Sequence, residues 1–186
     1  MDYFFYGRDG DDTGELRSRI VEDHWAFMDR FADSMIARGP TLTDDRRTAT
    51  GSVHIVDLPD PESVRVFAYE EPNYVAGVYR HVTVRRYVDL LGRTMGDFPG
   101  LRDESRACHL VLARSRPLTD WPGTEPALDR DRLVAFGRLL SEDGEDWEGT
   151  AVIGEFPEPG AVRDLFAATG AYDLIEVHPW TFGGRR

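Results

Sequence analysis

Apolar residues recur with two different periods along the first half of the chain, and these periods predict its secondary structure. Aromatic residues crowd the first six positions, which favours a short strand. Apolar residues then recur at helical spacing until Gly39-Pro40, a pair that typically ends a helix. The elements expected here are a strand at 2–6, a helix at 15–38, a strand at 52–58, a helix at 60–70 and a strand at 79–87. Residues 41–50 leave room for a short extra strand or a polar loop.

The second half shows the same succession in a shorter form. We expect strands at 107–114, 150–156 and 174–180, and helices at 127–136 and 160–168. Between the halves, residues 91–106 are rich in glycine and proline, which is typical of a linker.

The two halves are related by an internal repeat. When the chain is shifted by 98 positions, residues 37–67 lie on residues 135–165 without a gap, and ten of the 31 pairs are identical. Several of the identical residues are glycines and prolines, whose backbone geometry must be the same in both copies if the fold is the same. The sequence therefore predicts one small domain that has been duplicated and fused.

Each half follows the order β-α-(β)-β-α-β, which predicts an α+β fold of the ferredoxin-like, split βαβ type. One face of such a sheet carries the helices, and the other face needs a cover, which the second sheet can supply. We expect two domains, 1–90 and 107–186, joined by the linker 91–106. They should pack sheet to sheet as an intramolecular pseudo-dimeric α+β barrel, with the whole chain a monomer or a homodimer.

Composition and charge restrict the partners. The chain has 34 acidic and 22 basic residues and a net charge of −12, which argues against a nucleic-acid partner. Its one cysteine, Cys108, lies in an apolar run, so we expect a buried thiol, no internal disulfide and no cysteine metal site. No apolar stretch approaches the ~20 residues of a membrane span, and no leader is evident. We expect a cytoplasmic protein without a membrane partner.

Four features of the first half occur together. They are the aromatic strand DYFFYGRDG, Arg17 followed seven residues on by His24, the pair Gly39-Pro40, and EEPNYVAGVYRHVTV at 70–84. This set resembles the YCII-related (YciI-like) family of the dimeric α+β barrel superfamily. The likeness covers the first half, whereas the second half keeps only the strand-turn-helix-strand portion and the final VHPW.

The resemblance implies a working dyad of a histidine and an acidic residue, which here falls on His24 and Glu71. The family usually has Asp at the second position, so Glu71 is a departure, and Glu70, Asp44 or Asp45 are alternatives. Family members with an assigned role are small cofactor-independent enzymes, including one with dehydrochlorinase-like activity on a substituted aromatic. We therefore expect neither a cofactor nor a metal.

The chemistry of His24 supports the same assignment. An imidazole with a pKa near ~6.5 can take and give a proton near neutrality. His24 lies three residues before Phe27 and four before Met28, on an apolar helix face where a polar group needs a partner. A core histidine bonded to a backbone carbonyl is the structural alternative. The residues expected to line a substrate pocket are Arg17, as an anion contact, and Tyr6, Trp25, His54 and Tyr74.

The two halves differ at the dyad positions. The 98-residue register places His24 on Pro122, and a deletion after Ala168 removes the counterpart of Glu71. This joint loss predicts one site per chain, in the first half. Two functions fit: a cofactor-independent enzyme doing proton-transfer chemistry (elimination, isomerisation or cyclisation) on a small organic substrate, aromatic or polyketide-like, or a non-catalytic small-ligand-binding or accessory protein that uses the same cavity.

Overall fold

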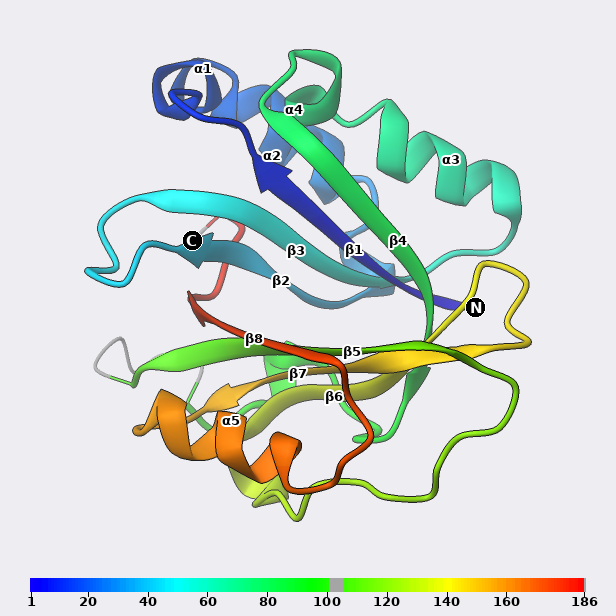
Figure 1. Ribbon diagram of the computed structural model, residues 1–186. Helices are drawn as coiled ribbons and strands as arrows, with labels where there is room; N and C mark the ends of the chain where they lie inside the picture. Colours follow the sequence, from blue (N-terminus) through cyan, green and yellow to red (C-terminus); the bar gives the residue numbers. More distant parts are fainter. Residues whose placement is uncertain (101–105, 186) are drawn as a thin grey trace.

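The computed structural model describes residues 1–100 and 106–185, and its strands close into one antiparallel barrel (Figure 1). The order around the barrel is β1-β3-β2-β8-β5-β7-β6-β4. The first half contributes β1 (Asp2–Asp9), β2 (Met35–Leu42), β3 (Ala49–Asp57) and β4 (Tyr79–Asp89). The second half contributes β5 (Cys108–Leu118), β6 (Leu133–Leu140), β7 (Trp147–Glu155) and β8 (Leu174–Trp180).

Both halves have the same internal strand order, β4-β1-β3-β2 in the first and β8-β5-β7-β6 in the second. In each half a helix follows the third strand: α3 (Pro61–Tyr69) after β3 and α5 (Pro159–Ala167) after β7. A shift of 98 positions carries the bounds of β2, β3 and α3 onto those of β6, β7 and α5, residue for residue. The barrel closes where β4 pairs with β6 and where β2 meets β8 at Thr41 and Trp180.

The helices are distributed unequally over the outside of the barrel. α1 (Gly14–Arg19), α2 (Val21–Asp29), α3 and α4 (Pro72–Val75) cover the first half, at the top of Figure 1, whereas α5 covers the second half at the bottom. In the described part of the chain, no helix combines the length and the hydropathy needed to cross a membrane.

Side chains from both halves fill the barrel interior. Phe4 and Tyr6 of β1 pack there with Leu110 of β5, Ile153 of β7 and Trp180 of β8, and all five are at most 1% exposed. A second apolar cluster lies between α2, α3 and the outer face of the first half, and a third lies beneath α5. Because the interior is packed, a ligand cavity has to lie elsewhere.

The prediction of one long helix over 15–38 is wrong for the second part of that range. The chain is helical only to Asp29, with a break at Ile20, and a single 3-10 turn then leads into β2. Gly39-Pro40 therefore lies inside a strand and does not end a helix. A Cβ on Gly39 would lie 1.9 Å from the backbone oxygen of Thr181, so close contact with the second half explains this glycine.

The helix expected over 127–136 is also wrong, because β6 occupies Leu133–Leu140. Both faces of β6 are buried: Val134 and Ala135 belong to the barrel interior, and Leu133 and Phe136 belong to the cluster under α5. A strand that is buried on both faces loses its alternation and resembles a helix segment in sequence.

The other expected elements occur with small shifts in their bounds. Residues 43–48, within the stretch left open between a strand and a loop, form the polar turn between β2 and β3. In the linker, Met95–Asp97 form a 3-10 turn, and Phe98 packs into the barrel core. The rest of the linker includes residues 101–105, which lie outside the described residues.

Candidate functional site

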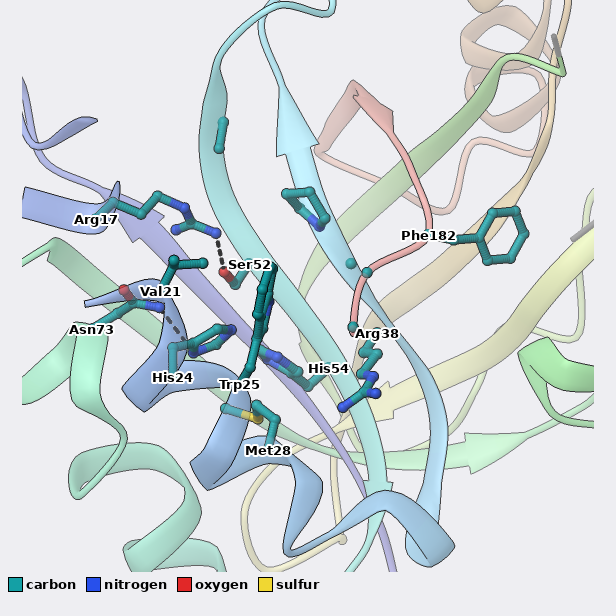
Figure 2. Close-up of a pocket in the computed structure, with 15 residues that line it drawn as sticks. Arg17, Val21, His24, Trp25, Met28, Arg38, Ser52, His54, Asn73 and Phe182 are labelled. Atoms are coloured by element: carbon teal, nitrogen blue, oxygen red, sulfur yellow. Dashed lines mark hydrogen bonds between the residues drawn. The ribbon is translucent and has the colours of Figure 1, made fainter. Parts of the chain in front are cut away.

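A cavity of about 310 Å³ lies on the outer face of the first half (Figure 2). α1 and α2 form one side of it, and the outward-facing residues of β2 and β3 form the floor. α4 and the segment that follows β8 complete the lining. The lining residues that matter below are Arg17, His24, Trp25, Arg38, Ser52, His54, Asn73 and Phe182–Gly184.

α2 presents His24 to this cavity, and α4 brings Glu71 against it. Glu71 is the N-cap of α4, and its Oε2 accepts a hydrogen bond from the backbone nitrogen of Tyr74 at 3.0 Å. Oε1 of the same carboxylate is bonded to Nδ1 of His24. Glu71 is only 2% exposed and His24 is 9% exposed. The helix cap therefore fixes the carboxylate, and the carboxylate fixes the imidazole.

This bond decides which ring nitrogen of His24 can react. An ionised carboxylate can only accept, so Nδ1 carries the proton and a neutral ring has its lone pair at Nε2. No described residue is hydrogen-bonded to Nε2. Because His24 lines the cavity, Nε2 is the nitrogen that remains for a bound molecule.

Asn73 is the third member of this group. Its Nδ2 lies 3.0 Å from Nδ1 of His24 (Figure 2). The same nitrogen lies 3.1 Å from the hydroxyl of Tyr79. Half a turn of the amide exchanges its oxygen and nitrogen, and Oδ1 can then accept from both Nδ1–H and the Tyr79 hydroxyl. Asn73 is therefore a second group that holds the imidazole in place.

Arg17 of α1 forms one end of the cavity. Its Nη1 donates to the carboxylate of Asp9 at 3.0 Å, and its Nη2 donates to the hydroxyl of Ser52 at 2.7 Å (Figure 2). Burial raises the pKa of Asp9, and the neighbouring Arg17 cation opposes that rise. The ion pair holds the guanidinium at the cavity wall.

His54 lies on the floor of the cavity, beside His24. Its neighbours in β3, Val53 and Ile55, point into the barrel, so His54 and Ser52 point outward to the helices. The rings of His24 and His54 are 5.8 Å apart. Burial lowers the pKa of His54 well below its usual value, and the positive charges of His24, Arg38 and Arg17 lower it further. His54 is therefore neutral at pH 7.

The residues after β8 bring the second half of the chain to this site. The backbone nitrogen of Gly183 donates to the carbonyl of Arg38 at 3.0 Å. Arg185 then pairs with two carboxylates of α2, with Asp29 at 2.9 Å and with Glu22 at 3.1 Å. We call residues 181–185 the C-terminal segment. It closes one side of the cavity through Phe182, Gly183 and Gly184.

The structure brings five of the seven residues expected at the site together, and it places two elsewhere. Tyr6 points into the barrel interior, where its hydroxyl lies 3.2 Å from that of Thr41. Tyr74 is 40% exposed and packs against Tyr69, because α4 turns Asn73 and Glu71 inward instead. The residues that meet at the cavity or directly behind it are His24, Glu71, Arg17, Trp25 and His54.

The alternative partners for His24 also lie elsewhere. Glu70 pairs with Arg65 on the exposed side of α3, and Asp45 accepts from Thr43 in the turn between β2 and β3. Asp44 lies beside a separate open depression. Among the described carboxylates, Glu71 is therefore the one that contacts the imidazole.

Sequence reasoning missed three polar residues of the cavity. Asn73 directly follows the Glu71-Pro72 pair, and its place in that motif was the signal that could have found it. Ser52 could have been found from its alternation with His54 in an expected strand. Arg38 gave no usable signal, since it falls in the part of β2 that resembles a helix.

The matching region of the second half carries no such group. Between β5 and β6 the described chain has no α-helix and only one 3-10 turn, at Arg130–Arg132, and Pro122 lies outside it. The outer face of this half is apolar, with Val111 and Phe136 packed against Phe166 of α5. Nowhere in residues 1–100 and 106–185 do three or more His, Cys, Asp or Glu side chains gather as they would around a metal ion.

Solved structures share the overall fold over nearly the whole chain. A proposed monooxygenase from Lactobacillus acidophilus matches 98% of this chain and 96% of its own, with a TM-score of 0.50 and 6% identity. A mutant chlorite dismutase from Candidatus Nitrospira defluvii, in complex with cyanide, matches 97% of this chain and 90% of its own, with a TM-score of 0.55 and 11% identity. These likenesses show the α+β barrel fold.

A third structure matches one half of the chain. It is the 5-chloro-2-hydroxyhydroquinone dehydrochlorinase of Burkholderia phenoliruptrix, with 24% identity and a TM-score of 0.45 over 48% of this chain and 95% of its own. No curated protein matches the sequence. The model of the YCII-related domain matches residues 1–88, the half that supplies both His24 and Glu71. The first half of this chain is a YCII-related domain.

Proposed function

We propose that the protein is a cofactor-independent enzyme that moves a proton on a small organic substrate bound in the cavity of the first half. Elimination, isomerisation and cyclisation are the reactions that such a group can catalyse. An aromatic or polyketide-like substrate suits them, because a neighbouring carbonyl makes its C–H bonds acidic and a phenol gains such a C–H bond in its keto form. The fold itself hosts several chemistries, so the proposal rests on the site.

One observation carries this proposal: a buried carboxylate holds Nδ1 of His24 and leaves Nε2 without a described partner at the cavity. In this arrangement Nε2 accepts the substrate proton and later returns it, and Glu71 stabilises the imidazolium that forms in between. Arg17 is the expected contact for negative charge that develops on the substrate.

Proton exchange in deuterium oxide tests the proposal without knowledge of the product. A panel of phenols and β-dicarbonyl compounds is followed by proton NMR with catalytic amounts of protein. We expect deuterium to enter one C–H position of a bound compound with the natural protein and not with His24→Asn. Compounds that bind in the cavity without any exchange or turnover would instead support the non-catalytic ligand-binding or accessory role.

We propose further that each chain has one such site, because the second half has neither the helix nor the carboxylate. Titration calorimetry with a compound that binds should give one equivalent per chain, and His24 should show the largest NMR shift. Two equal sites per chain would contradict this proposal.

We also propose that the chain arose by tandem duplication and fusion of one ferredoxin-like unit, with domains 1–90 and 107–186 and the linker 91–106. The common strand order and the 98-residue offset of three successive elements support it. The barrel is then an intramolecular pseudo-dimer. Cysteines at Val88 and Arg138, which face each other across β4 and β6, should form a disulfide within a monomeric chain. A disulfide that forms only between chains would show that the halves pair in a dimer.

A further inference from the structure

The lining of the cavity favours a negatively charged ligand. The guanidinium groups of Arg17 and Arg38 line the cavity, and none of the described lining residues is acidic. The chain as a whole has a net charge of −12. A cluster of cations on so acidic a protein is therefore a local feature of this cavity. The two arginines differ in one respect, since Arg17 already has hydrogen bonds to Asp9 and Ser52.

Arg38, in contrast, has unused donors. Its side chain is only 15% exposed, and its Nη1 is buried without a hydrogen-bond partner among the described residues. The carboxylate of Asp29 forms an ion pair with this nitrogen at 3.6 Å, beyond hydrogen-bond distance. A buried donor that makes no hydrogen bond costs free energy, and a buried cation costs more. A ligand with a complementary charge would remove that cost.

The C-terminal segment explains why Asp29 does not satisfy Arg38. Nε of Arg185 donates to Oδ2 of Asp29 at 2.9 Å, so this carboxylate already has a cation. Gly184 lies against the guanidinium of Arg38, where a Cβ would come within 2.4 Å of Nη2. The segment therefore covers one side of Arg38, whose side chain still lines the cavity.

We propose that Arg38 binds the carboxylate group of a small organic acid and so determines the substrate class of this site. The planar guanidinium matches a carboxylate with two parallel hydrogen bonds. This inference rests on the proposed function of the cavity and adds the charge of the substrate to it. Arg38 thus acts in recognition, and His24 acts on the reacting atom.

The geometry connects the two ends of the cavity. Arg38 in β2 lies directly opposite His54 in β3, and the His54 ring is 5.8 Å from that of His24. An acid anchored at Arg38 therefore extends over neutral His54 toward Nε2 of His24. The cavity volume of about 310 Å³ is at the lower end of the range for small-molecule sites, which restricts the acid to a single ring or a short chain.

Binding measurements with matched acids and amides test this inference. Benzoate is compared with benzamide, and butyrate with butyramide, by calorimetry and by NMR on the intact protein. We expect the natural protein to prefer one or both acids by roughly 10- to 100-fold, since the amide has the same shape without the charge. Arg38→Gln should remove this preference and leave amide binding unchanged. Arg38→Lys keeps the positive charge but cannot form two parallel hydrogen bonds to a carboxylate, so its affinity for the acids should be intermediate.

Two controls keep the inference separate from the proposed catalysis. Arg65→Gln, on the exposed side of α3, should bind every probe as the natural protein does. His24→Asn should also bind the acids normally, because binding does not require proton transfer. Loss of turnover with intact acid binding in His24→Asn, or no turnover at all, therefore leaves the inference in place. Equal affinity for acid and amide, or an unchanged acid preference in Arg38→Gln and Arg38→Lys, would overturn it, as would no binding of either acid.

Discussion

The two halves of the barrel have the same sheet and different outer faces. The first half is covered by four helices and contains a polar cavity, whereas the second half is covered by α5 over an apolar cluster. In the first half, α1 and α2 fill the stretch between the first two strands. In the second half the guanidinium of Arg138 stacks 3.6 Å above the ring of Trp121 in the corresponding stretch. The same four-stranded sheet therefore supports a ligand cavity in the first half and only completes the barrel in the second half.

The difference also shows that the second half is not passive. Its C-terminal segment crosses to the first half, closes the cavity and engages Asp29. Without this segment the first half would lack one wall of the cavity. The comparison thus separates the residues that we propose do the chemistry, all in the first half, from those that enclose the cavity.

The largest effect should come from the dyad. His24→Asn keeps a donor for Glu71 and removes Nε2, so turnover should fall by about 10²–10⁴-fold with little change in melting temperature. Pro122→Ala, at the corresponding position of the second half, should leave the rate unchanged. A variant that melts many degrees lower and keeps its specific activity in the cold would show that His24 is structural and that the site lies elsewhere in the cavity.

A smaller loss of rate is expected when the orienting group is changed. Glu71→Gln preserves the shape and can still accept from Nδ1, but it no longer stabilises an imidazolium. We expect turnover to fall by roughly 10- to 100-fold, less than in His24→Asn. Steady-state rates over pH 5–9 measure this loss of turnover. Glu70→Gln, a change at the exposed C-cap residue of α3, is the control. A rate equal to that of the natural protein would remove Glu71 from the mechanism.

The contribution of the second half should be several-fold in affinity. In Arg185→Ala the carboxylate of Asp29 is released and can neutralise Arg38, so binding of an acid should weaken. Adding Asp29→Asn should restore it, and this rescue is specific to the charge. Arg163→Ala, an exposed change on α5, is the matched control. Calorimetry checks the prediction, and unchanged affinity in Arg185→Ala would mean that the segment encloses the cavity without tuning it.

The smallest effect concerns the contact between the halves. Glu176 of β8 accepts from Arg8 of β1 and from Arg114 of β5, and the imidazole of His178 at 3.6 Å, followed by these cations, lowers its pKa to about 2. Its ordinary pKa is 4.5, so this stabilisation is complete above that pH and disappears as the pH falls from 4.5 toward 2.

We expect Glu176→Gln to lower the free energy of unfolding by about 1–3 kcal/mol at pH 7. The difference from the natural protein should vanish near pH 2. Urea unfolding at both pH values measures it, with Glu62→Gln, in an exposed pair on α3, as the control. A loss that persists unchanged at pH 2 would show that the effect is packing and not charge.

The sequence by itself determined the elements with clear turn residues at their ends. Pro59 and Asp60-Pro61 separate β3 from α3, and Pro157 and Pro159 separate β7 from α5, so these signals were sufficient although β3 and β7 are buried on both faces. The repeat came from identity between distant segments. The pairing of His24 with Glu71 came from the family pattern, and the apolar face around His24 gave independent support.

Only the tertiary structure decided that the segments of β2 and β6 are strands and not helices. β6 is buried on both faces along most of its length, so its apolar residues show no alternation. In β2, Met35 and Ile36 continue the helical spacing of the preceding helix, and the sequence therefore favoured a helix there too. The same error hid Arg38, whose outward direction depends on the strand. The position of the cavity outside the barrel, the inward direction of Tyr6 and the closure by the C-terminal segment all depend on contacts between residues far apart in the chain. Local patterns record that a residue is buried, and they do not record which distant residue buries it.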